Sequence, residues 1–446
     1  MARPLTKPPD RPSASRSSAG YVLGLLFAGN LLNFYDRALP SVVLEPIKDE
    51  FGLDDTRVGL LASAFVLVAA LAGIPLGRLA DRVARTAVAG WGLFVWSAFT
   101  AAGGLLTTFW GFLASRVGVG IGESSYAPAT GALLSDLYPS ERRSRAHSLV
   151  MLGFPIGTLL AFLTAGGLAE AFDSWRAPFL IAAVPGVAVA FLVLRIREPE
   201  RGAADPARPA PPPPHQSRRS SLLSLMRVRS MYGMLLAFAG YNFAAYAIGT
   251  FLTPLLQRYY GLSLVAAGAV GGVVVGVTGL IGLLAGGRVL DRAAGRSPEA
   301  RVQVAAVSLL AAAVFSFAGL VAGRGALWQL VVFLSLGYML GIVYLAAAVP
   351  VVSDVIRPEQ RSGALGLLFA FGYLLGGAGG PVCVGVLSDT MAADSASATE
   401  ASARGLHGAM LTTVPLAFAV AAIGMLLAAR SVRGDRDSML SGETTP

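Results

Sequence analysis

The sequence predicts an all-α membrane protein with twelve transmembrane helices, arranged as two similar bundles of six. Three observations lead to this expectation. The 446 residues are 54% hydrophobic and only 14% charged, with a mean hydropathy of +0.64, whereas soluble domains carry roughly 25% charged residues. Twelve long apolar segments follow one another along the chain. Short charged motifs recur at matching places in its two halves.

Each apolar segment is long enough to cross a bilayer as a helix, because about 20 residues span about 30 Å of hydrocarbon. A helix also satisfies its own backbone hydrogen bonds where no water is present. In chain order, the predicted spans are residues 20–43, 58–78, 87–107, 110–135, 148–169, 177–195, 230–257, 262–287, 302–323, 326–353, 362–388 and 405–429.

Lys and Arg are unequally divided between the loops, and this division sets the expected orientation. With both termini in the cytoplasm, the cytoplasmic loops and tails hold 27 of the 35 Lys and Arg residues, and the opposite loops hold 6. The remaining two lie inside spans. We therefore expect a multi-pass protein of a bacterial inner membrane, with both termini cytoplasmic.

A Pro- and Arg-rich stretch separates the two sets of six spans. It contains the run from Pro211 to Pro214, and this composition predicts an extended, flexible linker. The expected organisation is a disordered cytoplasmic tail at 1–19, a six-helix bundle at 20–195, a cytoplasmic linker at 196–229, a second bundle at 230–430 and a cytoplasmic tail at 431–446.

The same charged sequences follow the second and eighth spans and end the fourth and tenth. GRLADRVAR after the second span corresponds to GRVLDRAAGR after the eighth, and SDLYPSERRSRA corresponds to SDVIRPEQRSGA. Duplicated six-span halves are typical of rocker-switch transporters. The predicted gating residues are Gly77, Asp81, Arg82, Arg85 and Asp136 in the first half, and Asp291, Arg292 and Asp354 in the second.

The chemistry of the first loop predicts how it works as a gate. Gly77 permits close helix approach. We expect Asp81 to face the N-terminus of the eleventh span, where the helix dipole favours an acid. We also expect Arg82 and Arg85 to pair with Asp136. These contacts would hold the cytoplasmic side shut while the opposite side is open.

These motifs resemble those of a known superfamily. The paired Gly-x-x-x-Asp-Arg loops, with Arg116-x-x-x-Gly120 in the fourth span, resemble the signatures of the major facilitator superfamily over about residues 20–430. Three shorter motifs, NFYDR at 33–37, GIGESSY at 120–126 and WRAPF at 175–179, resemble the Spinster family of lipid transporters. The resemblance implies the major facilitator fold and transport of a lysolipid or related amphipathic molecule.

One departure from the family patterns leaves the direction of coupling open. GFPIG at 153–157 only approximates the Gly-Pro motif of antiporters. Symport and antiport therefore both stay possible at this point.

Four ionisable residues, Asp36, Arg37, Arg116 and Glu123, lie well inside predicted spans. Each costs several kcal/mol there unless it is paired or hydrated. The first three lie about 10 Å below the outer boundary at 1.5 Å per residue, so we expect an Asp36–Arg116 pair or a triad with Arg37. Glu123 follows Arg116 by two turns on the same face, near the midplane.

We hypothesise that Asp36 and Glu123 take up and release protons, and so bias the conformational equilibrium. The Spinster resemblance implies the same roles for these acids. The predicted charge partners and headgroup contacts are Arg37, Arg116, Asn33 and Tyr126.

The spans of the second half have no such charges and offer only isolated polar groups. The predicted cavity residues there are Tyr241, Asn242, Tyr246, Tyr338, Tyr344 and Tyr373. One charged wall and one largely apolar wall suit an amphipathic substrate, with its headgroup at the charges and its tail against the second half.

Other classes of function require features that this sequence has only in part. Multidrug or organic-anion efflux would use a similar cavity and stays open. A membrane-embedded enzyme is disfavoured because the three histidines are scattered and no metal-ligand spacing or Gly-rich phosphate loop occurs; a passive channel is also less favoured. The net charge of +9 forms no stripe for nucleic acid. We expect a monomer without metal or cofactor, with the proton as coupling ion.

Overall fold

The computed structural model of the chain describes residues 19–201, 228–357, 360–392 and 398–441, together with Ala204 and Leu225. All regular structure in these ranges is helical. The predicted N-terminal tail, most of the predicted linker and the last residues of the C-terminal tail lie outside the described residues.

The first half of the chain forms a helical bundle that we call the N-half. The α5–α6 path is interrupted at Ser125, and the α7–α8 path is interrupted at Leu152. Its helices are α1 (Ala19–Val42), α2 (Leu44–Phe51), α3 (Asp55–Arg82), α4 (Arg85–Gly103), α5 (Phe109–Ser124), α6 (Tyr126–Leu137), α7 (Ser140–Met151), α8 (Gly153–Ala171) and α9 (Ala177–Leu194).

The second half forms a matching bundle, the C-half. Two of its paths contain a π-helical stretch, η1 and η3, each beginning at a glycine. Its elements are α11 (Arg229–Arg258), α12 (Leu264–Gly271), η1 (Gly272–Val277), α13 (Thr278–Ala294), α14 (Pro298–Leu320), α15 (Leu327–Val355), α16 (Arg361–Phe371), η3 (Gly372–Ala378), α17 (Gly379–Met391) and α18 (Ala398–Ser441).

Ten helices of the described chain are long and apolar enough to cross a membrane. They coincide with ten of the twelve predicted spans. The other two predicted spans correspond to α1 and to the α5–α6 path. Polar residues such as Asn33 and Asp36 dilute the apolar character of α1, and α5 stops after 16 residues, just before Ser125. These are the two paths that carry the four predicted intramembrane charges.

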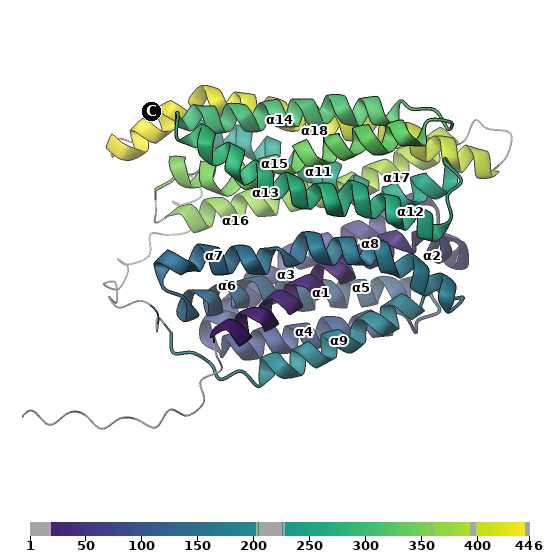
Figure 1. Ribbon diagram of the computed structural model, residues 1–446, viewed down its shortest axis with the longest axis horizontal. Coiled ribbons are helices and arrows are strands. Elements are labelled where there is room, and N and C mark those ends of the chain that lie inside the picture. Colours follow the sequence, from purple (N-terminus) through teal and green to yellow (C-terminus); the bar gives the residue numbers. More distant parts are fainter. Residues whose placement is uncertain are drawn as a thin grey trace, which may run out of the picture.

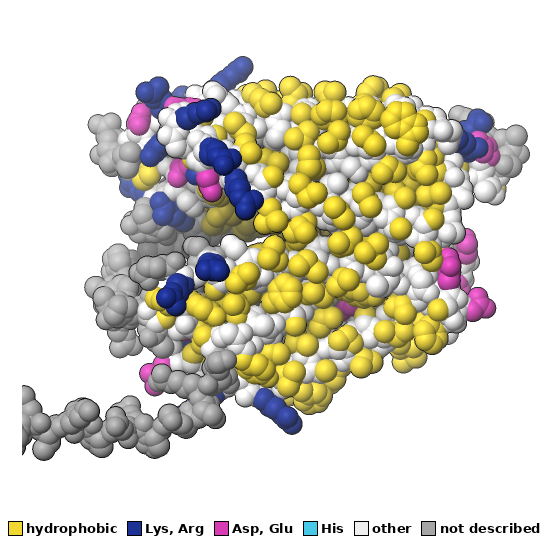
Figure 2. All heavy atoms as spheres, viewed as in Figure 1, with side chains coloured by type: hydrophobic (Ala, Val, Ile, Leu, Met, Phe, Trp, Pro, Cys, Tyr) yellow, Lys and Arg dark blue, Asp and Glu magenta, His cyan; other side chains and the backbone are white. Residues whose placement is uncertain are grey.

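The two halves lie side by side, with the N-half below and the C-half above in Figure 1. Apolar side chains cover the middle of the molecule, and Lys and Arg gather at one end, on the left of Figure 2. We call this the basic end, and the opposite one the far end. The start of α1 and the end of α18 both lie at the basic end (Figure 1).

The halves meet along two seams. In one, α3 packs against η3 and α17, and in the other α8 packs against α12 and η1. Glycines allow the close approach. A Cβ at Gly59 of α3 would meet the Pro381 backbone carbonyl of α17, and one at Gly276 of η1 would lie 2.7 Å from the Leu159 Cβ of α8. Figure 2 shows the surface hollowed between the halves towards the basic end.

Candidate functional site

The four intramembrane charges come together in the N-half, where α1 meets α5. Asp36, Arg116 and Glu123 are each at most 3% exposed. The side chain of Arg37 is 28% exposed. Of these four residues, Arg37 is therefore the one that reaches accessible space.

Arg37 and Glu123 form an ion pair between α1 and α5. The Arg37 Nε atom lies 2.6 Å from the Glu123 Oε2 atom. The guanidinium also lies 5.0 Å from the Phe34 ring centre and 5.4 Å from that of Phe65. Asn33, one turn before Arg37 on the same face of α1, is also buried. A buried carboxylate is tolerated when it has a partner such as Arg37, whereas an unpaired one is costly.

Asp36 points away from this pair, into the interior of the N-half. Its Oδ2 atom accepts a hydrogen bond of 3.3 Å from the Thr100 hydroxyl of α4. The Arg116 Nη2 atom donates to the backbone carbonyl of Asp36 at 3.2 Å. Asp36 Oδ1, Arg116 Nη1 and Glu123 Oε1 are buried without a hydrogen-bond partner.

The sequence predicts an ion pair between the Asp36 carboxylate and Arg116, but the described residues pair differently. Arg116 contacts the Asp36 backbone, and the arginine that pairs with a carboxylate is Arg37, whose partner is Glu123. The reason is helix geometry, because successive residues of a helix point about 100° apart. Asp36 consequently faces α4, while Arg37 faces α5 and the C-half.

Tyr246 of α11 and Tyr373 of η3 lie opposite the Arg37–Glu123 pair. Their rings make an edge contact with a centroid distance of 6.3 Å. Both rings pack against the buried apolar cluster of the N-half that contains Phe65, and the Phe65 ring centre lies 5.4 Å from the Arg37 guanidinium. Two of the predicted cavity residues thus face the charged wall across the boundary between the halves.

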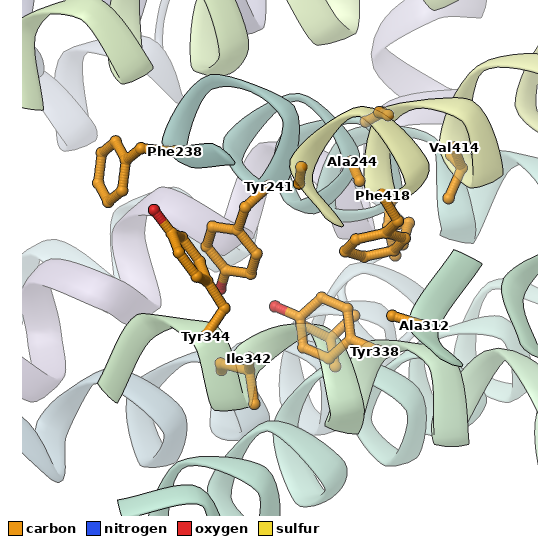
Figure 3. Packing of buried hydrophobic residues seen from close by; sticks show 14 of the residues in the cluster. Phe238, Tyr241, Ala244, Ala312, Tyr338, Ile342, Tyr344, Val414 and Phe418 are labelled. Carbon is orange, nitrogen blue, oxygen red and sulfur yellow. The ribbon is translucent and has the colours of Figure 1, made fainter. Parts of the chain in front are cut away.

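The other predicted cavity residues lie deeper in the C-half. Figure 3 shows the rings of Tyr241, Tyr338 and Tyr344 turned toward one another, and the Tyr241 and Tyr344 ring centres are 5.5 Å apart. The Tyr344 hydroxyl is buried without a hydrogen-bond partner. Asn242 donates one hydrogen bond from its side-chain amide to the Phe238 carbonyl of its own helix at 2.8 Å, which leaves one N–H of the amide and its oxygen for other contacts.

Tyr126 lies apart from the four charges. Its ring packs against Trp96 at a centroid distance of 5.3 Å and fits against Gly29 of α1. Its hydroxyl donates to the Leu26 carbonyl at 2.9 Å. The structure therefore gives Tyr126 a packing contact between α1 and α6.

The predicted gating motif at the basic end is assembled in part. Arg85 and Asp136 form a buried ion pair, as expected from the sequence. Arg82 is exposed, and Gly77 lies against Pro128 of α6. The side chain of Asp81 lies outside the part of the structure that is described.

In the C-half, the equivalent ion pair joins Arg301 of α14 and Asp354 of α15 at 3.0 Å. In each half, an arginine at the start of the third span thus pairs with an aspartate at the end of the fourth. Asp291 and Arg292 are both exposed. The repeat seen in the sequence holds for the ion pairs, although the arginine involved, Arg301, lies five residues beyond Arg296, the last residue of the GRVLDRAAGR motif.

Glu198, which follows α9, was not singled out by the sequence. Its two carboxylate oxygens accept hydrogen bonds from the backbone amides of Arg85 and Thr86 at 3.0 and 2.9 Å, and from the side chains of both residues. It therefore caps the N-terminus of α4, where four amides have no partner within the helix. Nothing in its local sequence distinguishes it from Glu200.

Glu198→Gln should lower the free energy of unfolding by about 1 kcal/mol at neutral pH, because a charged cap is lost. Burial alone raises the pKa of Glu198, but the hydrogen bonds from Thr86 and Arg85 outweigh it and hold its pKa below the ordinary value. The stabilisation is therefore present above the unfolded pKa of about 4.3 and lost as pH falls through the lower folded pKa. Thermal unfolding in detergent at neutral and acidic pH measures this difference.

Glu200→Gln is the matched control, because Glu200 is exposed. It should leave the unfolding temperature unchanged at both pH values. Equal losses in the two variants at neutral pH would contradict the capping role of Glu198.

Comparisons with known proteins place these features in a family context. The model of the Major Facilitator Superfamily matches residues 26–381. An "MFS-type efflux pump" of Mycolicibacterium smegmatis is 32% identical over 417 residues, which cover 93% of each chain. The "Sphingosine-1-phosphate transporter SPNS2" of Danio rerio is 28% identical, over 82% of this chain and 76% of its own.

A solved structure shows the same arrangement of helices. It is described as a bacterial homolog to the human lysosomal transporter Spinster, in an inward-facing and unoccupied conformation. It superposes with a TM-score of 0.84 at 26% sequence identity, covering 95% of this chain and 99% of that one.

Proposed function

The chain belongs to the major facilitator superfamily, and from that premise we propose that it is a proton-coupled secondary transporter of a lysolipid or related amphipathic molecule. The protein alternates between states open to either side of the membrane. All twelve predicted spans cross the bilayer, including α1 and the α5–α6 path. The basic end faces the cytoplasm of a bacterial cell, following the excess of Lys and Arg there.

The observation that carries this proposal is the position of the Arg37–Glu123 pair. It lies in the N-half beside Phe65, and Tyr246 and Tyr373 of the C-half pack against the apolar cluster that contains Phe65. A headgroup that reaches the partly exposed Arg37 competes with Glu123 for the guanidinium. Protonation of Glu123 frees Arg37, so proton uptake and substrate binding are linked at one guanidinium.

Asp36 has a separate place in the proposed mechanism. Its carboxylate faces Thr100 of α4 and not the C-half. A change in its charge therefore alters how α1 packs against α4 within the N-half. Asp36 therefore acts on a contact within the N-half, and Glu123 acts on one at the boundary between the halves.

Efflux of drugs or organic anions is the second candidate function. The specific observation that favours it is the similarity to the mycobacterial relative, which is described as an efflux pump and matches 93% of this chain. A charged wall opposite tyrosine rings also suits an amphipathic drug. The two candidates differ in substrate and share the proposed site.

The experiment uses purified protein in liposomes with an imposed pH gradient. We expect the gradient to accelerate movement of a fluorescent lysolipid, and we expect Glu123→Gln and Asp36→Asn to abolish that acceleration. Glu200→Gln serves as the control, because Glu200 is exposed at the basic end. If both site variants keep the proton dependence of the unchanged protein, proton coupling at these acids is wrong.

The same liposomes distinguish the two substrates. Movement of a cationic dye, without movement of the lysolipid, would favour the efflux function. Movement of neither compound by the unchanged protein, under either direction of the gradient, would count against both candidates.

A further inference from the structure

The N-terminus of α3 is capped at the far end by a carboxylate from the other half of the molecule. Asp389 of α17 accepts hydrogen bonds from the backbone amides of Asp55 and Thr56 at 3.1 and 2.8 Å. It also accepts one from the Thr56 hydroxyl at 2.5 Å. The first amides of a helix lack intrahelical partners, and the helix dipole favours a negative charge there. This cap therefore joins the two halves.

An ion-pair cluster lies beside the cap. Arg258, at the end of α11, donates to Asp55 at 2.8 Å and to Glu45 of α2 at 2.6 Å. Lys48 of α2 lies 2.6 Å from Asp55. Ser388, next to Asp389, donates to Asp55 at 2.6 Å. Asp55 is 1% exposed, so these contacts are shielded from water and from salt.

The short helix α2 carries two of these residues and is fixed to the N-half. Glu50 of α2 accepts two hydrogen bonds of 2.5 Å from Arg176 and one of 2.6 Å from the Trp175 indole. Trp175 and Arg176 begin the WRAPF motif. The motif thus holds α2 where Glu45 meets Arg258, and α2 moves with the N-half.

We propose that Asp389 and Arg258 are positioning residues for alternating access, which together hold the far end shut and release it in the opposite state. The inference rests on the proposed transport cycle. We call this set of residues, Glu45, Lys48, Asp55, Thr56, Arg258, Ser388 and Asp389, the far-end lock. Every contact from Asp389 or Arg258 to an N-half residue in it is broken when the halves separate at that end.

The N-terminus of α3 also has a cap from within the N-half. Asp54 already caps α3 from within the N-half, because its carboxylate accepts from the Arg57 amide at 2.7 Å. When the halves separate, α3 keeps this cap and loses only that of Asp389. The contacts of Asp389 therefore bear on the relation between the halves more than on the helix itself.

The far-end lock has a counterpart in the gate predicted at the basic end. There, Asp81 at the end of α3 is expected to face the N-terminus of α16. The α3 helix and the α16–α17 path would then each present a carboxylate to the N-terminus of the other, at opposite ends of the bundle. A rocking motion about the centre breaks one contact as it forms the other, so the two caps replace each other during the cycle.

The test is the distance between spin labels across the far end. Cysteines placed at Leu105 and Gly323, in a Cys383→Ser background, report on the two halves, because both positions are exposed in far-end loops. We expect Asp389→Ala and Arg258→Ala to shift the distribution to longer distances. Asp54→Ala, which removes the cap within the N-half, should leave the distance distribution unchanged. Asp389→Glu, which keeps a carboxylate at this position, should retain most of the short distances.

A milder variant keeps the inference testable if the alanine variants fail to fold. Thr56→Val removes only the hydroxyl bond to Asp389, and we expect a smaller shift in the same direction. Unchanged distances in a folded Asp389→Ala or Thr56→Val protein would overturn the inference, as would an equal shift in Asp54→Ala. Because the distances are measured without substrate, this failure is distinct from a failure of transport in liposomes.

Discussion

Arg37→Met should destabilise the protein by about 3–5 kcal/mol, because it leaves a buried carboxylate without its partner. The Glu123 side chain is fully buried, and its Oε2 atom lies 2.6 Å from the Arg37 Nε atom. We also expect the variant to lose lysolipid transport, since Arg37 is the charge of this site that reaches accessible space. Thermal unfolding in detergent and uptake in liposomes measure the two effects.

The double variant Arg37→Met with Glu123→Gln separates the two roles of the pair. Removing both charges should restore most of the stability, because no uncompensated charge remains. Transport should stay absent. Arg404→Met is the control, since its pair with Glu400 lies at the surface and such pairs contribute about 0–1 kcal/mol. Equal destabilisation by Arg37→Met and Arg404→Met would show that burial of the pair is not decisive.

Gly59→Ala should open the far end, even though alanine favours a helix by about 1 kcal/mol over glycine. A methyl group at this position meets the backbone carbonyl of Pro381 on α17. Backbone atoms cannot turn aside as a side chain can, and overpacking of this kind costs about 1–3 kcal/mol. We expect faster amide hydrogen exchange in the first turns of α3 and in α17.

Gly131→Ala is the matched control, because a Cβ at Gly131 of α6 meets nothing within 4 Å. It should leave exchange at the seam unchanged. Unaltered exchange in Gly59→Ala would show that the seam between α3 and α17 adapts to a methyl group. The close approach at Gly59 would then have no part in closing the far end.

The existence of the charged site could be predicted from the sequence, but its pairing could not. Charges inside apolar segments are conspicuous because they are costly. Which arginine pairs with which acid depends on the rotation of each helix about its axis, and packing sets that rotation. Asp36 and Arg37 are neighbours in the chain, yet one faces α4 and the other faces α5.

Most of the pairing and capping residues at the ends of the bundle could not be predicted from the sequence. Arg85 and Asp136 pair as predicted, since they belong to repeated motifs. Arg258, Asp389 and Glu198 belong to no motif and lie at helix ends, where charged residues are common. Their partners are at least 112 residues away in sequence. Only the folded arrangement shows that two of them cap helices and that the third joins two acids.

The two π-helical stretches give two helix paths of the C-half a geometry that differs from that of their counterparts in the N-half. Both η1 and η3 lie on the C-half side of a seam, whereas α3 and α8 contain no π-helix within residues 19–201. A π-helical turn holds more residues than an α-helical turn, so conversion between the two rotates everything beyond it. A model of the opposite conformation therefore cannot be obtained by giving each half the helix geometry of the other half. Beyond η1 and η3, the side chains of the C-half would be rotated relative to their counterparts in the N-half.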